Sequence, residues 1–272
     1  MGGVLWARLS PYWQVTRRSF RRYATYRGAT VAGVFTNSVF GLLKAYILLA
    51  VYQHRHTVGS FDATDVVTFT FVAQGFLATV GAFGDLELSE RIRTGDVVSD
   101  LYRPLHFQGY WLSSEVGRAM FQALFRGIPP FLVGAIVFHL RLPPDPQAWC
   151  AFVISVALAI VVSFAYRFIT ALSGFWLLDT RGPSQVASFV MQFCSGFIVP
   201  LTFLSGSLYR WATLLPFASV AQLPIEVFLG KHRSAGDTAW VLGVQIFWAI
   251  VLVGIGEIIV RRAFRKVVVQ GG

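Results

Sequence analysis

Charged residues are scarce in this sequence. Asp, Glu, Lys and Arg together make up 13% of 272 residues, whereas about 25% is usual for a soluble domain. Hydrophobic residues account for 55% and aromatic residues for 15%, and the mean hydropathy is +0.60. This composition excludes an ordinary soluble enzyme and indicates an integral membrane protein that crosses the bilayer several times.

Cysteines and catalytic motifs are also few. Cys150 and Cys194 lie in apolar stretches without CxxC spacing, so we expect neither a disulfide nor a metal site from them. The patterns GxxxxGK[ST], HExxH, GxSxG and GxGxxG are absent. His54 and His56 form a close pair but lack a third ligand nearby. The sequence therefore predicts no catalytic residues, no metal site and no cofactor bound by this chain.

Six long apolar stretches are separated by short polar segments. A helix that crosses the hydrocarbon needs about 20 residues. The chain is therefore predicted to be an all-α membrane protein with six transmembrane helices, at 29–52, 66–83, 116–139, 148–178, 186–208 and 239–260. The segment 209–237 before the last span is broken by Pro216, Pro224 and Gly230, and its apolar runs are too short to span. It is predicted to form two re-entrant half-helices on the outer side.

The net charge of +10 comes from basic residues between the apolar stretches, a placement that sets membrane orientation rather than nucleic-acid binding. With both termini in the cytoplasm, fifteen lie inside: Arg8, Arg17, Arg18, Arg21, Arg22, Arg27, Arg91, Arg93, Arg103, Arg118, Arg181, Arg261, Arg262, Arg265 and Lys266. Five lie outside: Arg55, Arg141, Arg210, Lys231 and Arg233. This bias predicts cytoplasmic N and C termini.

Three basic residues lie deeper within the predicted spans: Lys44, Arg126 and Arg167. Such charges cost about 2.5–3.5 kcal/mol at the bilayer centre and usually face a cavity or a partner. Arg126 and Arg167 either line a polar pathway or lie off the midplane with their guanidiniums at the interface. Lys44 sits well inside its span and is the better candidate for a substrate pathway.

The N-terminal segment 10–27 mixes aromatic residues with arginines. It is predicted either to form an amphipathic helix lying at the membrane interface or to act as a basic arm that only sets topology.

The cytoplasmic loop 84–105 is the richest in charge. Gly95 is predicted to end one helical piece and Asp96 to cap the next, in which Val97, Val98 and Leu101 share a face until Pro104. Such a short amphipathic helix either rests on the membrane or docks into a groove on a soluble partner. The candidate docking residues are Glu90, Arg91, Arg93, Gly95, Asp96, Val97, Val98, Asp100, Leu101, Arg103 and Pro104.

With these features the chain resembles the ABC-2 type permeases, the membrane subunits of ATP-binding-cassette exporters, and in particular their smaller six-span bacterial branch. The resemblance rests on the basic N-terminal arm, the six spans and the loop ERIRTGDVVSDLYRPL at 90–105. It also rests on the broken segment with LLPFA at 214–218 and PIEVFLG at 224–230. The loop is the more specific of these features.

This resemblance implies that the loop carries a coupling helix for a separate ATPase subunit, which would bind ATP and magnesium. It also implies two ATPase copies, a second permease subunit that is identical or paralogous, and export across the bacterial plasma membrane. Two alternatives are a transporter or channel driven by an ion gradient and a membrane scaffold. The residues do not identify the cargo, although an aromatic path would suit a hydrophobic or amphipathic substrate.

Overall fold

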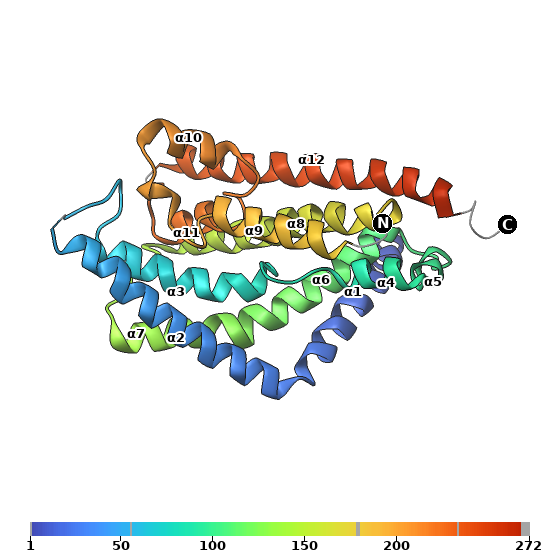
Figure 1. Cartoon of the computed structure of the whole chain (residues 1–272), viewed down its shortest axis with the longest axis horizontal. Helices are drawn as coiled ribbons and strands as arrows, with labels where there is room; N and C mark the ends of the chain where they lie inside the picture. Colours follow the sequence, from blue (N-terminus) through green and yellow to red (C-terminus); the bar gives the residue numbers. More distant parts are fainter. Residues whose placement is uncertain (1, 55, 178–179, 233, 268–272) are drawn as a thin grey trace.

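The computed structural model describes residues 2–54, 56–177, 180–232 and 234–267, and this part of the chain contains helices and no strand. Most helices run along the long axis of the molecule (Figure 1). The all-α prediction is confirmed. Four helical stretches among the described residues are long and apolar enough to cross a membrane: Arg27–Tyr52, Phe107–Val137, Pro146–Phe175 and Ala235–Arg265.

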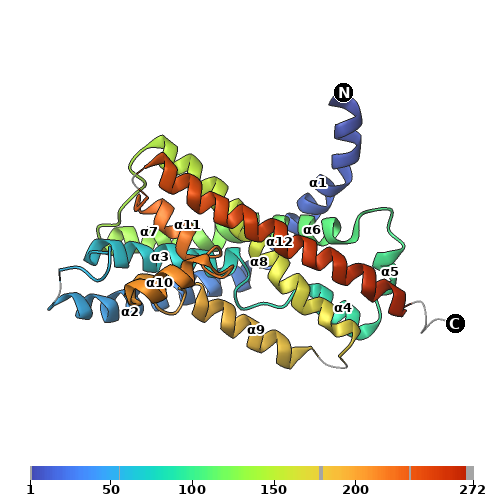
Figure 2. The same ribbon diagram turned by 90° about the horizontal axis from the view of Figure 1, so that it is seen from above.

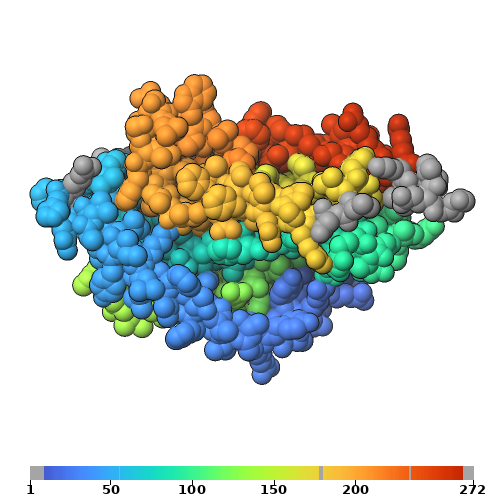
Figure 3. Space-filling model, viewed as in Figure 1, coloured from blue at the N-terminus to red at the C-terminus, as the bar shows by residue number. Residues whose placement is uncertain are grey.

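Helix α2 (Arg27–Tyr52) carries its large apolar side chains on its exposed face and smaller residues on its buried face. Its buried stripe consists of small or modest residues spaced three to five apart: Gly33, Ser38, Gly41, Ala45 and Leu48. Its outer face carries Phe35 and Ile47, which are 70% and 68% exposed. Small residues bring helices close together in a bilayer, while large apolar side chains face the lipid. The space-filling view shows α2 in blue on the outside of the molecule (Figure 3).

Helix α3 (Ala63–Thr79) lies at the centre, and nearly all of its residues are buried. It begins at a capping box in which the Asp62 carboxylate accepts from the Asp65 backbone and the Asp65 carboxylate accepts from the Asp62 backbone. At 17 residues α3 is shorter than a usual span. It packs against α2 and against the π-helix and α7 introduced below, and these neighbours bury it.

The stretch Phe107–Val137 is one helical rod with a change of winding. It consists of α6 (Phe107–Gln122), a π-helix (Ala123–Gly127) and α7 (Ile128–Val137). Helix α8 (Pro146–Leu172) continues into a 3₁₀ turn (Ser173–Phe175). Helix α12 (Ala235–Val267) packs along α8. The Gln245 amide of α12 donates to the Ser155 backbone and accepts from the Ser155 hydroxyl, which ties these two long helices together.

The fifth predicted span differs from the structure. Helix α9 (Arg181–Cys194) has only 14 residues and ends well before 208. The chain then turns at Gly196, where φ is +93°, and Pro200 precedes a 3₁₀ turn (Leu201–Phe203). Neither residue continues a helix readily, which explains the interruption. Helices α10 (Gly206–Leu214) and α11 (Gln222–Phe228) follow as two separate short pieces before α12.

The connecting segments gather at two opposite ends. Helix α1 (Gly2–Ala24), the two short helices at 87–101 and the end of α12 lie toward one end, and the 53–62 segment, α10 and α11 lie toward the other (Figure 1). We call them the α1 end and the α10 end. Seen from above, α1 leaves the bundle at its N-terminus (Figure 2). The basic loops predicted to be cytoplasmic therefore share the α1 end.

A buried ion cluster holds the α10 end together. Asp65 is fully buried, and one carboxylate oxygen accepts from Arg141 at 2.5 Å while the other accepts from Lys231. Arg141 also reaches Asp62 at 3.1 Å. Because Arg141 precedes α8 and Lys231 follows α11, the cluster fixes both connections to the start of α3. Burial raises the pKa of Asp62, but the Asp65 backbone N–H and Arg141 outweigh that effect and leave its pKa lowered.

Helix α1 docks on α6 through a close approach at Gly117, and this contact yields a prediction. A β-carbon at Gly117 would overlap the Thr16 carbonyl of α1 and lie 2.9 Å from the Ser19 β-carbon. Gly117→Ala should therefore destabilise the protein by about 1–3 kcal/mol, the usual cost of overpacking. The matched control is Gly243→Ala in α12, which has open space and should be neutral or stabilising. Thermal unfolding in detergent measures both, and equal stabilities would contradict this packing.

Candidate functional site

The loop at the α1 end folds as two short helices, α4 (Glu87–Thr94) and α5 (Val97–Leu101), joined at Gly95. Gly95 adopts a φ of +82°, the left-handed conformation that favours glycine at a helix C-terminus. Acidic residues in the first turn of α4 and arginines in its last turn complement the helix dipole. The loop is therefore an ordered corner rather than a free segment.

The corner is built around the buried carboxylate of Asp100, which is 3% exposed. Arg91 donates to both of its oxygens, from Nε at 2.7 Å and from Nη2 at 3.1 Å. Arg103 reaches it at 2.9 Å, and Arg91 also donates to the Ser99 hydroxyl at 2.9 Å. Partial burial would lower the pKa of Arg91, but the hydrogen bond and charge of Asp100 leave it raised. Two arginines thus close α4 onto α5.

The predicted docking residues divide between two faces of this corner. Val97 is buried in the main core and Leu101 packs against it, whereas Val98 is 40% exposed. Val98, three residues before Leu101, therefore lies at the solvent-facing edge of the stripe that Val97 and Leu101 bury. Further exposed candidates are Glu90, Arg93, Gly95, Asp96 and Pro104. Arg93 pairs with Glu90 at 2.5 Å, and this pair lowers the pKa of Glu90.

Two local expectations are corrected. Asp96 makes no side-chain cap to α5; its carboxylate instead accepts from the Thr94 hydroxyl at 2.9 Å, because its backbone is already helical. Helix α5 ends at Leu101, three residues before Pro104, since the residue before a proline disfavours helical geometry. Tyr102, which the sequence analysis did not single out, is 84% exposed beside Val98.

Contacts anchor this corner to three long elements. Arg22 of α1 pairs with Glu87 of α4 at 2.7 Å, and that hydrogen bond raises the pKa of Arg22. Leu88 is fully buried in the main core, which also includes residues of α8. His106 lies 3.0 Å from Glu257 of α12, which separately accepts from Arg261 at 3.1 Å. Displacement of the corner would therefore act directly on α1, α8 and α12.

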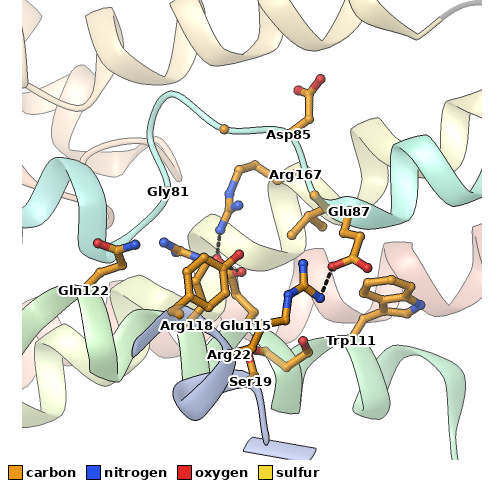
Figure 4. A pocket seen from close by; sticks show the side chains of 14 residues that line it. Ser19, Arg22, Gly81, Asp85, Glu87, Trp111, Glu115, Arg118, Gln122 and Arg167 are labelled. Atoms are coloured by element: carbon orange, nitrogen blue, oxygen red, sulfur yellow. Dashed lines mark hydrogen bonds and ion pairs between the residues drawn. The ribbon is translucent and has the colours of Figure 1, made fainter. Parts of the chain in front are cut away.

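A buried ion cluster lies between the corner and the spans (Figure 4). Glu115 of α6 is 5% exposed and accepts from Arg118 at 2.6 and 2.8 Å. It also accepts from Arg167 of α8, which is 6% exposed. Arg167 therefore does not reach the interface by extending its side chain, because Glu115 partners it inside the protein. The cluster lines a cavity of about 170 Å³ that also touches α1.

Arg118 joins the same cluster to the end of α3. Its two terminal nitrogens donate to the carbonyls of Ala78 and Thr79, at 2.6 and 2.8 Å. The last carbonyls of a helix have no partner within it, so a guanidinium here both bonds them and complements the helix dipole. The cluster consequently joins α3, α6 and α8 at one level of the bundle.

Lys44, the candidate for a substrate pathway, lies in α2 and is partly buried. Its ammonium donates to the carbonyl of Phe197, in the non-helical segment that follows α9. Lys44 therefore lies apart from the docking corner and from the Glu115 cluster. Sequence spacing placed Glu115 and Arg118 three residues apart, which was a usable signal. No local signal paired them with Arg167, which is 52 residues away from Glu115.

The Asp100 corner yields a second prediction. Asp100→Asn removes the charge that holds Arg91 and Arg103, and we expect a local destabilisation of about 1–3 kcal/mol, since both guanidiniums retain some solvent. Hydrogen exchange of residues 87–105 should accelerate while the spans stay protected. The control Glu90→Gln breaks an exposed pair of little energetic value and should leave exchange unchanged. Unchanged exchange in Asp100→Asn would show that the corner does not depend on this carboxylate.

Comparisons with known proteins agree with the architecture. The model of the ABC-2 family transporter proteins matches residues 40–271, which covers most of the helices and the whole α4–α5 corner. A comparison with curated proteins gives no match, and a comparison with solved structures gives none either. Because the family model extends over well more than half of the sequence, the chain belongs to the ABC-2 family of transporter membrane proteins.

Proposed function

We propose that this chain is the permease subunit of an ATP-driven exporter in the bacterial plasma membrane. In this proposal two permease subunits, identical or paralogous, form a pathway, and two copies of a separate ATPase bind at the α1 end. ATP and magnesium bind to the ATPase, and this chain contributes no catalytic group. The observation that carries the proposal is the ordered α4–α5 corner, which belongs to a chain of the ABC-2 family.

The exposed side of the corner has the character of a docking surface. Tyr102 and Val98 present apolar area on this corner, which also carries the exposed charged residues Arg93, Glu90 and Asp96. Interfaces typically combine an aromatic anchor with a polar rim. The interior of the corner is held by Asp100, so binding here requires little ordering of the loop, which favours affinity.

The directions in which the helices run support a protein that crosses the membrane six times. The two helices that fall short of the usual length, α3 and α9, still run between the α10 end and the α1 end, as α2 and α8 do (Figures 1 and 2). Val80 to Phe83 follow α3 before the chain reaches α4, whereas the chain after α9 turns at Gly196. The α1 end is then cytoplasmic, which agrees with its basic loops. Helices α10 and α11 would dip in from the outer side.

A hydrophobic cargo is supported by an apolar cavity of about 370 Å³ between α3, the π-helix, α8 and α11. Its lining is almost wholly apolar and includes Phe76, Phe131, Phe152 and Phe228. Local π-helical winding often marks functional sites in membrane helices. The alternative, a transporter driven by an ion gradient, would favour carboxylates in the transport path. The buried acids Glu115 and Asp65 are instead paired with arginine or lysine, whereas the buried Glu226 of α11 accepts from Tyr209 and Gln222.

The docking proposal predicts the effect of a charge at the exposed aromatic residue. Tyr102→Asp should weaken ATPase binding by about 2 kcal/mol, roughly 30-fold, because an interface anchor is lost without a change in the core. Co-purification of the ATPase in mild detergent and thermal unfolding of the permease are measured together. The control is Tyr26→Asp, an exposed tyrosine in the turn after α1. Retained ATPase binding in Tyr102→Asp would reject this surface.

The cargo proposal predicts that filling the apolar cavity reduces transport. Val156→Trp places an indole in the cavity, and ATP-driven accumulation of an apolar fluorescent dye in reconstituted vesicles should fall several-fold. Val153→Trp, on the same helix but 63% exposed, is the matched control. Both variants must retain the ATPase for the comparison to be valid. Equal dye transport in the two variants would place the pathway elsewhere.

A further inference from the structure

Arg126 is a partly buried cation without a partner in the part of the chain that the structure describes. It lies in the π-helix, and its Nε atom is buried and makes no hydrogen bond. The guanidinium lies against Gly33 of α2, so closely that a β-carbon there would overlap it. Placing a charge among apolar helices costs several kcal/mol unless something pairs with it. The position therefore calls for an anion.

The surroundings of Arg126 hold more positive than negative charge. Arg118 and Arg167 share the single carboxylate of Glu115, and Arg126 adds a third cation nearby. The neighbouring carboxylate of Glu87 is engaged by Arg22, and Asp85 points away from the cluster (Figure 4). One carboxylate for three guanidiniums leaves two unbalanced positive charges among the described residues of this region.

A cavity of about 270 Å³ opens beside these cations. Its lining residues include Asn37, Gln122, Arg118 and Arg126, with Phe83 at its side. Gln122 is 8% exposed and its side-chain oxygen has no hydrogen-bond partner; as an acceptor, this oxygen can bind a water molecule or a hydroxyl group of a ligand, not the anion itself. The volume greatly exceeds the roughly 30 Å³ that one water molecule occupies in the liquid. The cavity can therefore hold a polar group larger than water.

The position of the cavity matches the depth of lipid headgroups. Gly33 is six residues from the start of α2, about 9 Å along the helix, and Ala78 is one residue from the end of α3. Phe83 is 69% exposed and Phe125 is 49% exposed. Apolar side chains thus surround a cationic opening near the cytoplasmic end of two helices, where basic pockets between helices can hold anionic headgroups.

We propose that this cavity binds a phosphate group, with Arg126 as its main ligand and Arg118 supplying additional positive charge. The guanidinium of Arg126 offers five donors in a planar fork that fits phosphate in two-point fashion. An anionic phospholipid of the cytoplasmic leaflet and a free phosphate share this chemistry, and the experiment separates them. The proposal stands independently of ATPase docking, because the charge imbalance is present in this chain alone.

The test uses the full-length protein, freed of lipid in detergent and kept in phosphate-free buffer. Native mass spectrometry then measures binding of phosphatidylglycerol, of phosphatidylcholine and of inorganic phosphate. Wild-type protein should bind phosphatidylglycerol more tightly than phosphatidylcholine, and Arg126→Gln should bind it about tenfold or more weakly, as expected for a charge-assisted contact. Arg126→Lys keeps the positive charge but loses the planar fork of donors. Its affinity for phosphatidylglycerol should lie between those of wild type and Arg126→Gln.

Two further variants separate the site from general electrostatics. Gly33→Ala keeps every charge but displaces the guanidinium, so it should weaken phosphatidylglycerol binding as well. Arg261→Gln removes an equal charge from a side chain that is 75% exposed on α12 and should bind like wild type. Inorganic phosphate that binds wild type but not Arg126→Gln, without lipid selectivity, would assign the site to a soluble anion.

Thermal unfolding keeps the proposal falsifiable if a variant folds poorly. Without added anion, Arg126→Gln should be at least as stable as wild type, because it removes an unpaired cation. Added phosphatidylglycerol should then raise the unfolding temperature of wild type more than that of Arg126→Gln. Equal binding of both phosphatidylglycerol and inorganic phosphate by wild type and Arg126→Gln would overturn the proposal.

Discussion

The bundle depends most on one shared carboxylate, that of Glu115. In a low-dielectric interior an isolated charge is costly, and Glu115 offsets that cost for Arg118 and Arg167 together. Arg118 additionally donates to the two last carbonyls of α3, at the point where the chain turns toward α4. The cluster therefore holds α3, α6 and α8 in register immediately beside the docking corner.

The same arrangement, one carboxylate shared by two cations, recurs at the other end. There one fully buried carboxylate, Asp65, accepts from Arg141 and Lys231 and fixes the connections that precede α8 and follow α11. The two ion clusters thus sit at opposite ends of the central helix α3, whose own side chains are mostly apolar. Apolar packing supplies attraction without a preferred register, whereas buried ion pairs penalise every register that separates them.

Hydropathy and the placement of arginines predicted the all-α fold and the location of the long helices, because both reflect the membrane as a solvent. They failed where a local irregularity decides the path. Helix α9 ends at Cys194, but the residues that follow are still apolar. Hydropathy alone therefore predicted a span that runs on to residue 208. The docking loop was recognisable from Gly95 and its charges, but burial of Asp100 and exposure of Tyr102 depend on how α4 folds against α5 and α8.

The anchoring of the corner also determines which helices can respond to it. Its contacts run to α1 through Glu87, to the core around α8 through Leu88 and to α12 through His106. Helix α2 instead meets α3 and α7, and its outer face is apolar. A force on the corner would thus move α1, α8 and α12 first, and would reach α2 through α1, which precedes it in the chain, and through α3. Arg126 of the π-helix lies against Gly33 of α2. An anion bound to Arg126 would therefore stiffen the contact between α2 and the rest of the bundle.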